Sequence, residues 1–113
     1  VVVAKGQPLE FREWRPGIRM EHGVWNIPIP AEGPPVAPDL AWVPLVGFDP
    51  GCFRLGYGGG FYDRTLAAAQ PRPRAVGIGY DCQRLDSIGP QPHDIPMDVI
   101  VTPTLAMERP GAG

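Results

Sequence analysis

The strongest constraint on the fold is a cluster of glycines that separates an apolar run from a helical segment. Residues 54–64 read RLGYGGGFYDR, and the apolar run 40–48 precedes them. After the glycines, Tyr62 and Leu66 stand four positions apart and three alanines follow at 67–69. This pattern favours a helix over 60–70, which Pro71 ends. The order of strand, glycine loop and helix is typical of βαβ units, so the sequence predicts an α/β fold.

Short apolar runs supply the strands of the predicted sheet. They are apolar on both faces, so we expect buried, mostly parallel strands at residues 1–4, 40–48, 75–80 and 98–102. Pro44 falls inside the second run, and we expect the strand to end there because proline cannot donate to a sheet ladder. The expected architecture is a mostly parallel sheet flanked by helices.

The organisation of the chain indicates one incomplete domain. The sequence opens on Val1, without methionine and inside an apolar run, so we expect a fragment of a larger three-layer domain that is incomplete at its N-terminus. Residues 1–106 are predicted to form this single α/β domain, with edge strands or extended segments within 5–39. No order is predicted after Thr104, and residues 107–113 are expected to form a flexible tail.

The composition excludes several classes of function. Hydrophobic residues make up 43% and charged residues 19% of the chain, which is typical of a folded soluble protein. The net charge of -2, without a basic stripe, argues against nucleic-acid binding, and no apolar run approaches the roughly 18 residues of a membrane span. Cys52 and Cys82 fit no disulfide framework, so we expect reduced thiols inside the cell. The protein is expected to be a cytoplasmic monomer.

The glycine loop suggests phosphate binding. Glycines permit positive φ angles and a close approach of ligands, and backbone N–H groups at a helix start hold phosphate oxygens. Two known motifs do not fit, because Phe61 stands where a Walker A loop needs lysine and where a dinucleotide-binding GxGxxG motif needs its last glycine. The alternative is a tight strand-to-helix turn stabilised by an Arg–Asp pair.

Charged residues beside the loop favour the phosphate hypothesis. Arg54 offers a bidentate, charge-assisted contact to phosphate. Asp63 falls in the first helical turn, where a carboxylate beside phosphates requires a bridging Mg²⁺; the alternative is an acid that complements the helix dipole. Asp94 is a candidate second metal ligand, and alternatively it caps a turn before Pro96.

Three stretches, taken in order, resemble the 5-formyltetrahydrofolate cyclo-ligase family, also called methenyltetrahydrofolate synthetases. They are WNIPIP at residues 25–30, residues 39–64 with the RLGYGGGFYDR segment, and residues 93–102, which begin His93-Asp94-Ile95-Pro96. The RLGYGGGFYDR segment is far more specific to this family than a generic glycine loop, and the resemblance covers residues 9–104.

The resemblance implies an enzyme that uses ATP and Mg²⁺ to convert 5-formyltetrahydrofolate into 5,10-methenyltetrahydrofolate, with release of ADP and phosphate. It assigns catalysis to Arg54 and Asp63, and Mg²⁺ binding to Asp63 and Asp94. The segment expected to contact ATP consists of Arg54, Leu55, Gly56, Tyr57, Gly58, Gly59, Gly60, Phe61 and Tyr62. The part of it expected to border the folate substrate consists of Tyr57, Gly58, Gly59, Gly60 and Phe61.

Two departures from the family pattern leave alternatives open. Family members carry an N-terminal segment with basic residues for ATP and an acidic residue for folate, which this sequence lacks, and Phe61 stands where tyrosine is common. A non-catalytic nucleotide-binding module is therefore the main alternative. A metal-binding domain is less favoured because no short zinc-site spacing joins His22, His93, Cys52 and Cys82.

Three tryptophans offer aromatic surfaces on which a pterin could stack. Packing in the core or at the sheet edge is the ordinary role of such side chains. Trp25 is the best candidate for a pterin contact among Trp14, Trp25 and Trp42.

Overall fold

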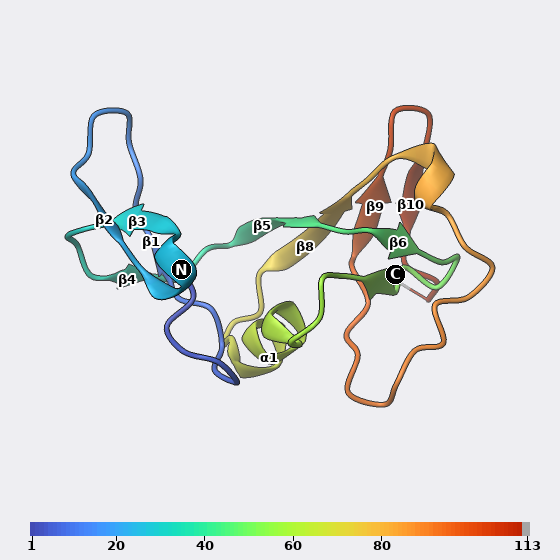
Figure 1. Ribbon diagram of the computed structural model, residues 1–113. Helices are drawn as coiled ribbons and strands as arrows, with labels where there is room; N and C mark the ends of the chain where they lie inside the picture. Colours follow the sequence, from blue (N-terminus) through green and yellow to red (C-terminus); the bar gives the residue numbers. More distant parts are fainter. Residues whose placement is uncertain (112–113) are drawn as a thin grey trace.

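The computed structural model describes residues 1–111, and its centre is a four-stranded sheet (Figure 1). The strand order is β10–β9–β8–β5, with bounds Leu40–Pro44 for β5, Arg74–Ile78 for β8, Val99–Val101 for β9 and Ala106–Glu108 for β10. The pairs β5–β8 and β8–β9 are parallel, whereas β10 runs antiparallel to β9. The predicted α/β class with a mostly parallel sheet is confirmed.

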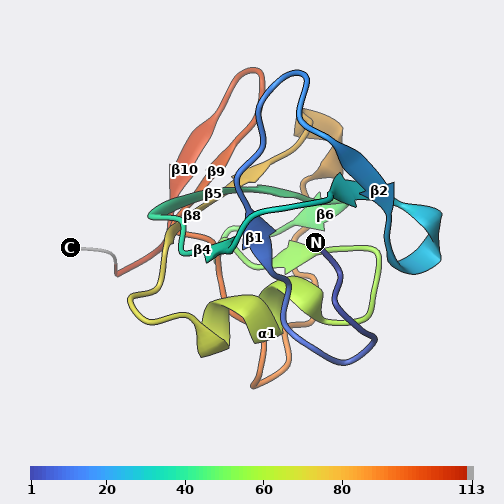
Figure 2. The same cartoon turned by 90° about the vertical axis from the view of Figure 1, so that its left-hand side faces the viewer.

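The α-helix that follows the glycine loop is α1, Phe61–Ala68. It lies beneath the sheet in Figure 2, and Leu66, which is 2% exposed, packs in the same core cluster as Val43 and Ile100. The helix predicted over residues 60–70 is confirmed, and Ala69 already has extended backbone angles ahead of Pro71. Among residues 1–111, no helix is long and apolar enough to cross a membrane.

Side chains of β5 alternate between two faces of the sheet, because successive strand residues point to opposite sides. Ala41 and Val43 are buried in the core, whereas Leu40 and Trp42 are 43% and 62% exposed. The register aligns Ile78 of β8 with this second side, and it is also exposed. We call Leu40, Trp42 and Ile78 the open face. The expectation that the strands bury both faces is wrong for β5, whereas the middle of β8, residues 75–77, is buried on both faces.

The segment before β5 forms two small antiparallel sheets, which lie to one side of the central sheet in Figure 1. Their strands are β1 (Phe11–Arg12) with β4 (Pro35–Val36), and β2 (Met20–His22) with β3 (Pro28–Pro30). A short 3-10 helix, Val24–Asn26, connects β2 and β3. The extended segments expected within 5–39 are therefore confirmed.

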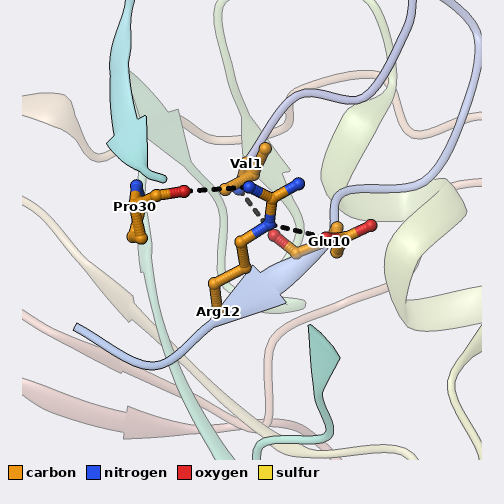
Figure 3. A network of polar contacts seen from close by, with 4 residues as sticks. All are labelled: Val1, Glu10, Arg12 and Pro30. Carbon is orange, nitrogen blue, oxygen red and sulfur yellow. Dashed lines mark hydrogen bonds and ion pairs between the residues drawn. The ribbon is translucent and has the colours of Figure 1, made fainter. Parts of the chain in front are cut away.

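The strand expected at residues 1–4 is wrong, because this end of the chain pairs locally instead. The Val1 amino group donates to the Glu10 carbonyl at 2.6 Å, and the Glu10 N–H donates to the Val1 carbonyl at 2.9 Å. Figure 3 shows this contact beside Arg12, which bonds the Glu10 carboxylate and the Pro30 carbonyl. Burial lowers the pKa of the Val1 amino group, and the Glu10 carboxylate opposes that shift.

A two-stranded hairpin carries the start of the glycine loop. It consists of β6 (Gly47–Phe48) and β7 (Arg54–Leu55), which pair antiparallel. As predicted from Pro44, the apolar run 40–48 leaves the central sheet at that proline. A second 3-10 helix, Asp81–Gln83, follows β8.

The absence of order expected after Thr104 is wrong for β10. Thr102 and Leu105 exchange backbone hydrogen bonds, and this tight turn returns the chain along β9. The partly buried Met107 lies opposite Ile100, between the exposed residues of the strand. Of the expected tail, residues 112–113 lie outside the described part of the chain.

Candidate active site

The glycine loop joins β7 to α1 in a left-handed backbone conformation. Gly58, Gly59 and Gly60 have φ angles of 97°, 83° and 64°, which side chains with a Cβ rarely adopt. Gly60 is the N-cap of α1 and supplies no side-chain hydrogen bond to the first turn. The first N–H groups of a helix have no partner within it, so they remain available to an anion at the loop.

Arg54 begins the loop and is held from two sides. Its Nε donates to the carbonyl of Pro44, at the carboxyl end of β5, over 3.1 Å. Its guanidinium lies 4.9 Å from the ring centroid of Tyr62, in a cation–π arrangement. Gly56 makes room for it, because a Cβ at that position would collide with the guanidinium. Two contacts therefore orient the Arg54 side chain at the start of the loop.

Burial shifts the pKa values of Arg54 and Tyr62 in opposite directions. Burial lowers the pKa of Arg54, and the charge of Asp63 is the strongest of the effects that raise it again. Burial raises the pKa of Tyr62, and the positive charge of Arg54 opposes that shift. At neutral pH the pair thus consists of a cationic guanidinium over a neutral phenol.

Asp63 and Asp94 approach the loop from α1 and from the segment before β9. Asp63 Oδ1 accepts a hydrogen bond from the Ile95 N–H at 3.0 Å, which ties the two segments together. Asp94 Oδ2 accepts from the Gln91 N–H at 2.8 Å, so the turn-forming role considered for Asp94 is present. Its Oδ1 lies 3.5 Å from His93 Nε2. Each carboxylate is oriented by the backbone.

One cavity of about 330 Å³ collects most of the predicted residues. Arg54, Asp63 and Asp94 line it together, along with most of the loop, and Gly59 lines a neighbouring cavity with Gly60 and Asp63. The residues of its wall that sequence reasoning missed are Pro44, Ile88, Gly89 and Gln91. A larger cavity of about 420 Å³ beside the N-terminal segment has one ionisable lining residue, Glu10, and offers less to a charged ligand.

Carboxylate oxygens are hard ligands that suit Mg²⁺. Two carboxylates, those of Asp63 and Asp94, line this cavity. Mg²⁺ is usually bound by one or two carboxylates together with substrate phosphates, rather than by a complete protein cage. Among residues 1–111 there is no group of three His, Cys, Asp or Glu side chains that could hold a metal alone. The alternative metal-binding domain with His22, His93, Cys52 and Cys82 therefore finds no support.

Trp25 lies next to the loop although it is distant in sequence. Its ring meets Phe61 edge to face, with centroids 5.8 Å apart and planes at 82°. The Trp25 backbone has a φ of 57°, which is uncommon for a bulky residue, and the side chain is 61% exposed. Such a strained, exposed aromatic residue beside a cavity is more typical of ligand contact than of core packing. Trp42 lies on the open face instead.

The fold and the cavity define a class of protein: an α/β domain in which a left-handed glycine loop, one arginine and two aspartates meet at a single cavity. The sequence model of the 5-formyltetrahydrofolate cyclo-ligase family matches residues 2–103, and the chain belongs to this family. It is 38% identical over 101 residues to the 5-formyltetrahydrofolate cyclo-ligase of Mycolicibacterium smegmatis, a match over 85% of this chain and 52% of that protein.

Other relatives agree with this membership. The chain is 44% identical over 71 residues to the 5-formyltetrahydrofolate cyclo-ligase of Escherichia coli, a match over 62% of this chain and 39% of that protein. The solved 5,10-methenyltetrahydrofolate synthetase of Aquifex aeolicus superposes with a TM-score of 0.70 at 33% identity, over 88% of this chain and 51% of that one. The chain thus spans about half the length of the relatives it matches.

Proposed function

We propose that this chain takes part in the ATP- and Mg²⁺-dependent conversion of 5-formyltetrahydrofolate to 5,10-methenyltetrahydrofolate, with release of ADP and phosphate. The single observation that carries the proposal is the shared cavity of Arg54, the glycine loop, Asp63 and Asp94. It combines a cation and backbone donors for phosphate oxygens with two carboxylates for a divalent ion.

ATP is proposed to lie with its phosphates against the loop from Arg54 to Tyr62. The consecutive left-handed glycines keep side chains away from the backbone, and a Cβ at Gly58 would point into open space where a ligand fits. The Arg54 guanidinium is already oriented by Pro44 and Tyr62, so little ordering is needed when phosphate binds. These features support a preorganised phosphate site.

Magnesium is proposed to be held by Asp63 and Asp94, because both carboxylates reach the cavity and neither forms an ion pair with Arg54 among residues 1–111. Bound there, the ion would neutralise phosphate charge and orient the transferred group. The alternative of a simple turn expects an Arg–Asp pair, and Arg54 does not form one with Asp63 or Asp94 among residues 1–111.

The proposed reaction requires the protein to position its substrates and needs no protein nucleophile. A formamide oxygen leaves poorly, so its phosphorylation by ATP creates a phosphate leaving group on the formyl carbon. The neighbouring amine of the folate then attacks that carbon, the ring closes and phosphate departs. Arg54 and the loop N–H groups would stabilise charge on the transferred phosphoryl group.

The folate substrate is proposed to border Tyr57 through Phe61. Tyr57 is 87% exposed at the mouth of the cavity, and the neighbouring Trp25 presents a second aromatic surface. Flat pterin rings stack on such side chains. The loop would then contact both substrates, with phosphate at its backbone and folate at its aromatic rim.

The test is the formation of methenyltetrahydrofolate, followed by its absorbance, with ATP and Mg²⁺ supplied and then withheld one at a time. Product that requires both supports the proposal. The second candidate is a nucleotide-binding module without turnover, which the same cavity with its glycine loop and Arg54 would also support. Nucleotide binding without product would establish that module, and no binding at all would reject both candidates.

A further inference from the structure

Asp49 is a buried carboxylate at which three backbone N–H groups converge. It is 4% exposed and follows β6 directly. Its Oδ1 accepts hydrogen bonds from Gly51 at 3.0 Å and from Phe53 at 3.2 Å, and its Oδ2 accepts from Ile88 at 3.2 Å. A buried charge is tolerated only when such donors compensate it, so these contacts define how the surrounding chain is arranged.

The donors come from two segments that are distant in sequence. Gly51 and Phe53 belong to the turn of the β6–β7 hairpin, whereas Ile88 belongs to the segment before β9. A backbone bond of 2.7 Å from the Leu85 N–H to the Phe48 carbonyl joins the same two segments beside Asp49. The carboxylate thus fastens the hairpin to a loop that has no regular structure of its own.

Both segments line the candidate active site. The hairpin carries Arg54, and the loop contributes Ile88 and Gln91 to the cavity lining. The Gln91 N–H in turn donates to Asp94 Oδ2, so the loop that Asp49 holds also orients a proposed magnesium ligand. Asp49 itself does not line the cavity.

We propose that Asp49 is a positioning residue that sets the spacing between the Arg54 wall and the Asp94 wall. This inference rests on the proposed function and adds a residue to it. Asparagine cannot replace the carboxylate, because both oxygens of Asp49 act as acceptors and the amide would present an N–H group to another N–H donor. The loop would then separate from the hairpin and the cavity would lose its spacing.

The experiment compares Asp49→Asn with Asp98→Asn. Asp98 is a matched control, because it also accepts a backbone hydrogen bond, from Ala75 at 2.8 Å, yet it lies outside the cavity lining. Both variants should unfold at lower temperature. Only Asp49→Asn should weaken MgATP binding measured by calorimetry, by about tenfold or more, and speed amide hydrogen exchange at residues 88, 89 and 91.

A second pair of variants decides the question if Asp49→Asn does not fold. Ile88→Pro removes the N–H donor to Asp49 and Ile88→Ala keeps it, while both shorten the side chain that lines the cavity. MgATP binding weaker in the proline variant than in the alanine variant supports the proposal. Equal binding in the two overturns it, as does unchanged binding and exchange in a folded Asp49→Asn.

The outcomes also separate this inference from the proposed function. A wild-type chain that does not bind MgATP contradicts the proposed function. Hydrogen exchange at residues 88, 89 and 91 then decides the role of Asp49 alone, since faster exchange in Asp49→Asn than in Asp98→Asn still shows that the carboxylate holds the loop. No difference in exchange between the two variants rejects that role.

Discussion

Asp63 is the side chain at which the proposed magnesium site can be tested most directly. In Asp63→Asn the amide oxygen can still accept the Ile95 N–H, so the fold should stay nearly unchanged. The lost negative charge should weaken Mg²⁺-dependent nucleotide binding roughly tenfold or more, because several kcal/mol of metal-assisted charge stabilisation depend on it. Calorimetric titration with ATP across a series of Mg²⁺ concentrations measures the effect.

The control for this substitution is Asp39→Asn, which removes the same charge from an exposed position before β5. It should bind MgATP as the wild type does. Identical Mg²⁺ dependence in Asp63→Asn and Asp39→Asn would remove Asp63 from the proposed site.

The two cysteines should differ sharply in reactivity. Cys82 is exposed, whereas Cys52 is fully buried and donates to the Met107 carbonyl at 3.4 Å. Burial, assisted by the negative charge of Asp49, raises the pKa of the Cys52 thiol. A thiol reagent should therefore modify Cys82 quickly and Cys52 only on unfolding. The Cys82→Ser substitution should abolish the fast phase of the reaction. Two fast phases in the native chain would contradict this assignment.

The raised pKa of Cys52 also predicts a pH dependence of stability. The unfolded thiol loses its proton at lower pH than the folded one, so its contribution is fully present below the ordinary thiol pKa and is lost as pH rises through the folded pKa. The free energy of unfolding, measured with urea, should fall on the alkaline side more steeply in the wild type than in Cys52→Ala. Parallel curves for the two proteins would reject this contribution.

The candidate residues were predictable from sequence to different degrees. Arg54 and Asp63 are predictable because they flank the glycine loop, whereas Asp94 is predictable as an acid ahead of a buried strand and from the family resemblance. The structure brings all three to one cavity. Ile88 was missed because its place in the wall depends on the tertiary bond to Asp49, which leaves no local pattern in the sequence.

Among the elements, the glycine loop depends most on backbone conformation. At Gly58, φ is 97° and a Cβ would meet nothing within 4 Å, so Gly58→Val should strain the loop and place a side chain where the ligand approaches. We expect a stability loss of about 1–2 kcal/mol and a much larger loss of ATP affinity. Thermal unfolding and nucleotide titration measure the two effects separately.

Gly33→Val is the matched control for the loop. Gly33 also has positive φ, at 107°, and a Cβ there would likewise meet nothing within 4 Å, but this glycine lies outside the cavity lining. The substitution should lower stability similarly and leave ATP affinity intact. An unaltered affinity in Gly58→Val would show that the phosphate site is elsewhere.

Elements built from local signals were predicted well, whereas elements that depend on pairing were not. The helix α1 follows from its apolar spacing and from Pro71, and both signals lie within the segment itself. The strand β10 exists because the turn at Thr102–Leu105 returns it to β9, and its short sequence shows no strand pattern. The apolar run at residues 1–4 predicts a strand of the central sheet, but Val1 instead forms backbone hydrogen bonds with Glu10.

For the molecule as a whole, the open face has a measurable consequence. Parallel sheets normally have both faces covered, yet Leu40, Trp42 and Ile78 are exposed on one side. A fluorescent dye that binds apolar surfaces should therefore bind the folded chain, and Trp42→Ser should reduce that binding. The control is Trp14→Ser, since Trp14 is similarly exposed, at 59% against 62%, but lies outside the sheet. Equal dye binding in both variants would contradict the prediction.

The bond from Arg54 to the Pro44 carbonyl places the candidate site at the carboxyl end of β5. Amino-acid substitutions in proteins of this kind should therefore be distributed unevenly along β5 and β8. Drift should be tolerated around Leu40 and Arg74, where β5 and β8 begin, while selection should conserve the opposite rim, where backbone and side chains together receive the ligand.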